Sequence, residues 1–210
     1  MNSVQKRIGG QFPTVYITFL SVVIGLALEG WVSILSTTPQ LFTITFKSTI
    51  LWLQMFQNLL FIIVAWVAYT QIAMVRRSIP SPFDAIQVLG FTLTLFLLNA
   101  AIGHSLALYN YAWAAYLLIG GLATYFAVGQ LKGEGKEFET YVSKIQSWRG
   151  PLALNAGGGL VCVGFGLGLE YDLVPPELQI IVLIIGATGV IMWMVIMHRI
   201  WRTHLVDAIN

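Results

Sequence analysis

The chain has 210 residues, of which 57% are hydrophobic and 10% are charged, and its formal net charge is +2. This composition leaves too little polar surface to cover a water-soluble globule of that length. The slight basic excess does not indicate a nucleic-acid partner, because the basic residues gather beside apolar runs, as they do in membrane proteins. We therefore expect one integral membrane domain over residues 1–210, surrounded by the lipid bilayer.

Six apolar runs are long enough to cross about 30 Å of hydrocarbon. Each run is almost uniformly apolar, so each is expected to be an α-helix. The sequence therefore predicts an all-α, polytopic membrane protein with six transmembrane helices. The predicted spans are about 14–36, 49–75, 84–108, 112–131, 151–170 and 178–198.

Two further segments need an interpretation of their own. Lys6 and Arg7 precede the first apolar run, as in a secretory signal peptide, but that run is long and no clear cleavage site follows it. We therefore expect it to remain as a helix. Residues 134–148 place apolar and charged side chains at helical spacing, which predicts a short amphipathic helix on the membrane surface. A loop packed on the helix bundle is an equally good interpretation of that segment.

The basic residues beside the spans predict the orientation of the chain. Only Lys47 falls on one side, together with short loops near 37–48, 109–111 and 171–177. Because basic residues favour the cytoplasmic side, we expect both termini in the cytoplasm and the protein in the inner (plasma) membrane. The residues expected on the cytoplasmic side are Lys6, Arg7, Arg76, Arg77, Lys132, Lys136, Lys144, Arg149, Arg199 and Arg202.

Small and hydroxylated residues recur along the first span at steps of three and four. At 100° per residue they occupy about a third of the helix circumference. Glu29 belongs to this stripe, and a carboxylate that faced lipid there would cost about 3 kcal/mol on insertion scales, so it should face protein or water. The stripe is either a packing seam or a face lined by water or ions. Its members are Thr14, Thr18, Ser21, Gly25, Glu29, Ser33 and Ser36.

Five polar side chains of the second and third spans are expected at a depth similar to that of Glu29. Such a cluster could bind a cation, relay a proton or hold a polar ligand. It could equally be a structural hydrogen-bond network that joins three helices. For the histidine alone, a position in the interface is the better interpretation. These residues are Gln54, Gln57, Asn58, Asn99 and His104.

The fifth span contains the close-packing motif Gly164-x-x-x-Gly168, which predicts a contact with another helix of the same or of a second subunit. It also contains Cys162, the single cysteine, which therefore cannot form an intrachain disulfide.

The first span reads Ser21-Val-Val-Ile-Gly-Leu-Ala-Leu28, and the second ends in Trp66-x-x-Tyr69 before a basic turn. Together with six spans and two cytoplasmic ends, these residues resemble the bacterial relatives of the lysosomal six-helix-repeat potassium channel family. In that family the first helix lines the pore of an oligomer, so the resemblance implies a channel with the first helix at its pathway. The sequence departs from the family's phenylalanine-serine-aspartate signature, where Leu20-Ser21-Val22 stands instead.

Two hypotheses of different classes follow. The first is a homo-oligomeric channel or transporter for a small cation, with the first helix lining the pathway and Glu29 near its outer mouth. The alternative is a non-catalytic membrane subunit that packs against a larger complex. We expect no enzymatic activity, no cofactor and no bound metal, because the sequence has no paired metal-ligand spacing, phosphate loop or nucleophile motif.

Overall fold

The computed structural model describes residues 3–75, 82–130 and 150–202. These residues form long α-helices and contain no β-strand. The prediction of an all-α, polytopic helical protein is therefore confirmed. The elements are α1 (Ser3–Thr37), the short 3₁₀ helix η1 (Pro39–Phe42), α2 (Phe46–Val75), α3 (Pro82–Ala101), α4 (Leu106–Gln130), α6 (Gly150–Glu170) and α7 (Leu178–Trp201).

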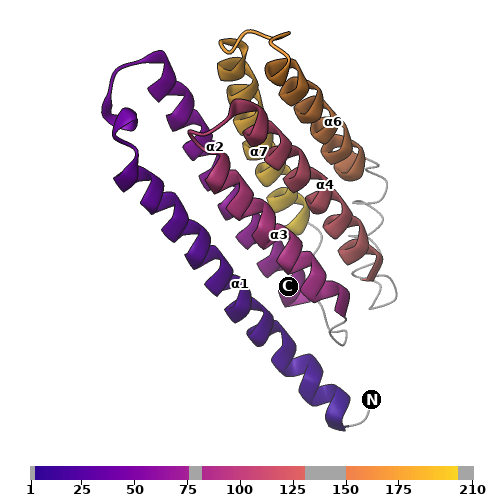
Figure 1. The fold of residues 1–210 in the computed structure, drawn as a ribbon. Helices are drawn as coiled ribbons and strands as arrows, with labels where there is room; N and C mark the ends of the chain where they lie inside the picture. Colours follow the sequence, from indigo (N-terminus) through magenta and orange to yellow (C-terminus); the bar gives the residue numbers. More distant parts are fainter. Residues whose placement is uncertain (1–2, 76–81, 131–149, 203–210) are drawn as a thin grey trace.

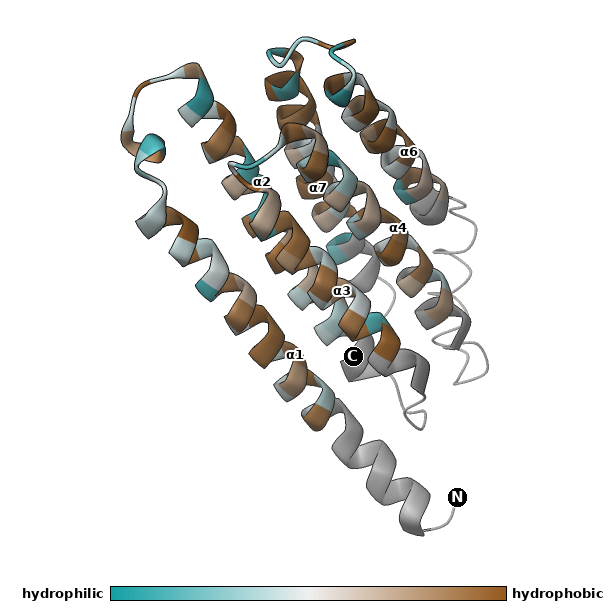
Figure 2. Ribbon diagram, in the orientation of Figure 1, coloured by the Kyte–Doolittle hydropathy of each residue, from teal (hydrophilic) through white to brown (hydrophobic). Residues whose placement is uncertain are grey.

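Five of the described helices contain segments long and apolar enough to cross a membrane, and α3 contains a shorter apolar segment, Ile86–Ala101. Hydrophobic residues cover most of the length of these helices (Figure 2). The predicted amphipathic helix over 134–148 lies outside the described residues. The five spanning segments are Thr14–Thr37, Phe46–Thr70, Leu106–Ala123, Ala153–Glu170 and Leu178–Ile196.

The turn between the third and fourth helices differs from the prediction. The sequence predicts a helix to residue 108 and a loop near 109–111, whereas α3 ends at Ala101 and α4 begins at Leu106. Gly103 has a φ of 78°, a left-handed conformation that is open to glycine and that ends the helix. Average hydropathy does not register this break, because only His104 and Ser105 stand between Gly103 and the next apolar residues. Tyr109, predicted in a loop, is consequently a fully buried residue of α4.

The helices pack in a defined order across the bundle (Figure 1). α1 lies along one side and contacts α2 and α3, α4 contacts α3 and α6, and α7 contacts α2. The connections 38–45, 102–105 and 171–177 lie at one end of the bundle, which we call the turn end. The opposite end, where α1 begins and α7 ends, is called the terminal end.

Glycines of α6 allow its close approach to α4. A Cβ atom on Gly159 would lie 3.2 Å from Leu118 Cγ, and one on Gly166 would lie 2.5 Å from Tyr111 Cε1. Small residues at such positions let helix backbones approach in a membrane, where packing rather than hydrophobicity holds helices together.

The predicted motif glycines lie outside this seam. Gly164 is exposed, and a Cβ there would meet nothing within 4 Å among the described residues. Gly168 instead approaches Val174 in the following connection. The described part of the chain therefore gives Gly164 no helix partner.

Candidate functional site

One side of α1 is held against the bundle. Leu20, Val23 and Ala27 are buried on that side. The indole Nε1 of Trp31 donates a hydrogen bond to the carbonyl oxygen of Met55 in α2, at 2.9 Å. These contacts fix the rotation of α1 about its own axis, and they determine which residues it presents outward.

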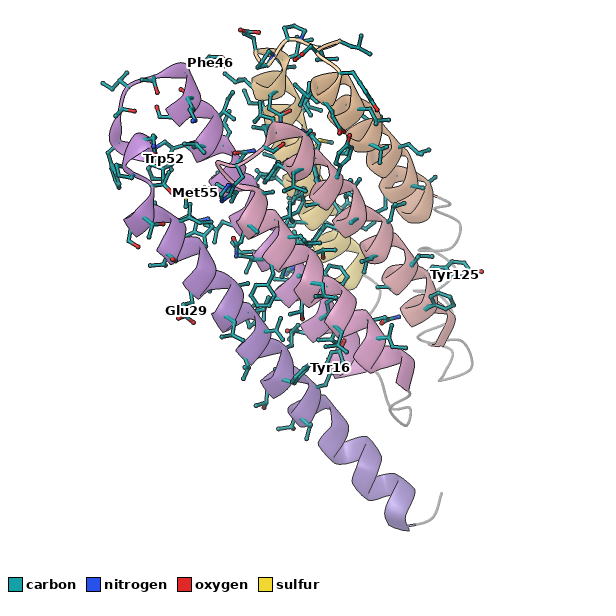
Figure 3. All side chains as sticks on the ribbon, in the orientation of Figure 1. Tyr16, Glu29, Phe46, Trp52, Met55 and Tyr125 are labelled. Atoms are coloured by element: carbon teal, nitrogen blue, oxygen red, sulfur yellow. The ribbon has the colours of Figure 1, made fainter. Side chains whose placement is uncertain are left out.

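The α1 stripe, which comprises Thr14, Thr18, Ser21, Gly25, Glu29, Ser33 and Ser36, lies on the other side. All seven residues are exposed in the isolated chain. Figure 3 shows Glu29 on the side of α1 that is turned away from the other helices. Glu29 lies eight residues before the end of α1, or about 12 Å from it at 1.5 Å per residue. The carboxylate therefore lies within the span Thr14–Thr37, and none of the described residues covers it.

The hydroxyl groups of Thr18, Ser21 and Ser36 in the stripe use their protons within the helix. Thr18 Oγ1 donates to the carbonyl oxygen of Thr14, and Ser21 Oγ donates to that of Ile17, both at 2.8 Å. Each hydroxyl oxygen keeps lone pairs that are free to accept. Together with the Glu29 carboxylate, these oxygens make a face that offers acceptors and a negative charge, which is the chemistry that suits a cation or its hydration water.

The predicted amides lie inside the bundle. Gln54, Gln57 and Asn58 are no more than 1% exposed, and Asn99 is 8% exposed. Asn58 Nδ2 donates to Asn99 Oδ1. Asn99 Nδ2 in turn donates to the carbonyl oxygen of Ala27, at 3.0 Å. This chain of hydrogen bonds joins α2 to α3 and α3 to the backbone of α1.

A second group of contacts joins α2 to α4. The Tyr109 hydroxyl donates toward the Gln54 carbonyl oxygen at 3.0 Å and toward Gln57 Oε1 at 3.1 Å. Tyr109 is fully buried, so this hydroxyl has no water to bond with in the bundle. The register between α2 and α4 is thereby fixed by polar contacts as well as by packing.

Sequence reasoning missed two buried amides. Asn110 Nδ2 donates to Gln179 Oε1 of α7 at 3.1 Å, and both residues are 0% exposed. The available signal was Gly103 followed by Ser105, whose hydroxyl accepts from the Leu108 backbone N–H at 3.2 Å and so caps α4. A helix that starts there places Asn110 inside the bundle rather than in a loop.

We call Gln54, Gln57, Asn58, Asn99, Asn110 and Gln179 the amide core. Several of its polar atoms have no hydrogen-bond partner among the described residues. They are Gln54 Nε2, Gln57 Nε2, Gln179 Nε2, Asn58 Oδ1 and Asn110 Oδ1. The core is uncharged, so its spare donors and acceptors suit neutral hydrogen-bonding groups better than a bare ion.

The structure thus separates residues that the sequence places at a common depth. Asn99 bonds the backbone of α1 at Ala27, on the side opposite to the stripe. Within the described chain, Glu29 forms no hydrogen bond or ion pair with the amides or with any other group. His104 is exposed in the turn between α3 and α4 and belongs to neither group.

Comparison of the chain with protein-family models, with curated proteins and with solved structures gives no match. The function therefore has to be inferred from the chemistry of the α1 stripe and the amide core.

Proposed function

We propose that the protein is a homo-oligomeric inner-membrane channel or transporter for a small cation, with the α1 stripe along the pathway and Glu29 near its mouth at the turn end. The observation that carries the proposal is the uncovered stripe itself. It combines outward-facing hydroxyl oxygens with a carboxylate at membrane depth. The resemblance of the first span to the bacterial relatives of the lysosomal potassium channels favours the same arrangement.

The cost of exposing a carboxylate to lipid supports an oligomer. That cost is about 3 kcal/mol on insertion scales, and the described part of the chain does nothing to offset it. In a ring of identical subunits, every copy would turn its stripe toward the common axis and away from lipid. Each copy would then contribute one Glu29 carboxylate, and a ring of carboxylates attracts cations into a pore.

The amide core has a different part in this proposal. Its hydrogen bonds hold α1, α2, α3, α4 and α7 in register, so that the stripe is presented by a fixed scaffold. Residues that position a pathway are most effective when they are fully packed, because packing fixes their rotamers.

We further propose that the terminal end faces the cytoplasm, because ten basic residues of the sequence belong to that side and only Lys47 to the other. Accessibility labelling of single cysteines tests this orientation. Labels at residues 171–177 are expected to react from outside the cell, and labels at the C-terminus only after the membrane is opened. Reaction of residues 171–177 from the cytoplasmic side would reverse the orientation.

Cation flux into liposomes that contain only this purified protein tests the function. Flux of K⁺, Na⁺ or H⁺ above that of empty liposomes is expected. Glu29→Gln keeps the side chain's size and removes its charge, so it should lower the flux several-fold or change its pH dependence. The matched control is Glu177→Gln, which makes the same chemical change at an exposed site outside α1.

The alternative function is that of a non-catalytic subunit of a larger complex. The same exposed α1 stripe would fit this function if a different protein covered it. It predicts no flux from the purified chain and no effect of Glu29→Gln beyond weakened assembly. Glu29→Leu separates the two functions further, because it removes all hydrogen bonding by the side chain. Normal flux in Glu29→Leu would contradict a role for this carboxylate in transport.

A further inference from the structure

A cavity of about 380 Å³ lies among α2, α3, α4, α6 and α7, away from the α1 stripe. Its lining includes Tyr69 near the end of α2, Leu154 near the start of α6 and Ile196 near the end of α7. The cavity therefore occupies the half of the bundle nearer the terminal end. Trp113 and Gly186 line it on the side toward the amide core.

The walls of the cavity combine rigid rings with residues that have little or no side chain. The Phe61 and Tyr116 rings lie 4.4 Å apart between centroids, and Phe91 meets Tyr116 edge-on at 5.1 Å. These contacts brace the rings and keep them from turning into the space. Gly120 and Gly189 line the cavity with backbone alone, and a larger side chain at either position would occupy part of the space.

The cavity reaches the surface of the bundle at residues of α6 and α7. Leu154 of α6 and Met192 of α7 line it and are still 62% and 59% exposed, so they form its rim. α6 packs on α4 and α7 packs on α2, so the two helices that carry these rim residues are held by different neighbours. Both rim residues belong to segments that are long and apolar enough to cross a membrane, so we expect this opening to face hydrocarbon.

A positive charge lies beyond the rim. Arg199 is exposed and follows Met192 by seven residues, which places both on the same face of α7. The rise over seven residues is about 10 Å, so the guanidinium lies between the cavity and the terminal end of the helix. This is the depth at which a lipid phosphate sits when its acyl chains enter the hydrocarbon layer.

We propose that this cavity binds one phospholipid, with an acyl chain between α6 and α7 and the phosphate beside Arg199. An acyl chain suits the space because the lining is almost entirely apolar and the opening faces hydrocarbon. The polar atoms at its wall are few, with Tyr69 Oη and Trp113 Nε1 the buried ones without a partner among the described residues, so a strongly polar ligand would lose more hydration than these two groups replace. The arginine supplies a charge-assisted contact for the phosphate, which fixes the lipid in one orientation.

The experiment uses full-length protein reconstituted with phosphatidylglycerol and phosphatidylcholine, then extracted in detergent and examined by native mass spectrometry. One retained phospholipid per chain is expected. Gly189→Leu should reduce retention at least fivefold, because a Cβ at Gly189 meets nothing within 4 Å and the added side chain would grow into the cavity. Gly157→Leu is the matched control, since that glycine of α6 is equally unobstructed but does not line the cavity.

A second measurement locates the lipid. A phospholipid with a diazirine on its acyl chain, irradiated after extraction, should label the peptides that contain Leu154 and Met192. Arg199→Gln should lower retention of phosphatidylglycerol and leave the labelled position unchanged. Wild-type retention in folded Gly189→Leu, or labelling spread evenly over all helices, would overturn the proposal. If Gly189→Leu does not fold, Ala68→Leu fills the same cavity from α2 and gives the same two readouts.

Discussion

The amide core and the α1 stripe place similar polar side chains in opposite surroundings. The core is buried and uncharged, and its hydrogen bonds connect neighbouring helices. The stripe is exposed, carries the Glu29 carboxylate, and directs its hydroxyl protons back to its own helix. In a bilayer, polar groups are stable where protein or water covers them. The difference teaches that the amide core is buried by helices of its own chain, whereas the described residues leave the stripe uncovered.

The largest expected effect comes from placing a large side chain at the glycine that packs most tightly beside the amide core. In Gly186→Leu, the new Cβ would lie 1.9 Å from Trp113 Cη2 and 2.5 Å from Gln57 Nε2. A leucine side chain cannot fit against the Trp113 ring and the Gln57 amide at these distances, so α7 should separate from α2 and α4 at a cost of about 3 kcal/mol. Size-exclusion chromatography should show loss of the folded protein. Normal yield and thermal stability would mean that this part of the bundle is looser than the structure indicates.

The next effect concerns the hydrogen bonds that join the core to α1. Asn99→Leu keeps the side chain's volume but leaves Asn58 Nδ2 and the Ala27 carbonyl oxygen without their partner. We expect a loss of roughly 1–3 kcal/mol, measured as a lower melting temperature in detergent. The comparison residue is Ser21 in the stripe, where Ser21→Ala should change the melting temperature little. Equal effects of the two substitutions would remove the distinction between core and stripe.

Two glycines of one helix provide the finest comparison. A Cβ on Gly30 would lie 2.8 Å from Asn99 Nδ2, whereas a Cβ on Gly25 would meet nothing within 4 Å. Alanine favours a helix over glycine by about 1 kcal/mol. Gly25→Ala should therefore leave the free energy of unfolding unchanged or raise it. For Gly30→Ala we expect a free energy of unfolding about 1 kcal/mol lower than that of Gly25→Ala. Thermal melts of the two variants in parallel give the difference, and a reversed order would contradict the rotation of α1 described above.

The sequence predicts a large part of this architecture. Long apolar runs identify the helices, because an α-helix satisfies its backbone hydrogen bonds within a single segment in lipid. The steps of three and four in the first span also predict that Thr18, Ser21, Gly25 and Glu29 share one face, since that follows from helical geometry alone.

What the sequence does not predict is which helix each polar side chain faces. Around a membrane helix, the sides toward lipid and toward protein are both apolar, so the pattern carries little information about orientation. Gln57 therefore gives no sign that its partner is Tyr109 of α4 rather than Glu29. The turn at Gly103 is hard to recognise for a related reason, because only His104 and Ser105 separate it from the next apolar residues.

The most direct test asks whether the α1 stripe lines the cation pathway. In liposomes that contain Gly25→Cys, a positively charged thiosulfonate reagent should place a bulky cation on the stripe. Wild-type protein is the control, since its Cys162 is 3% exposed and should not react. We predict that labelling of Gly25→Cys lowers cation flux several-fold while wild-type flux is unaffected. Unchanged flux after complete labelling would contradict the assignment of the pathway to α1.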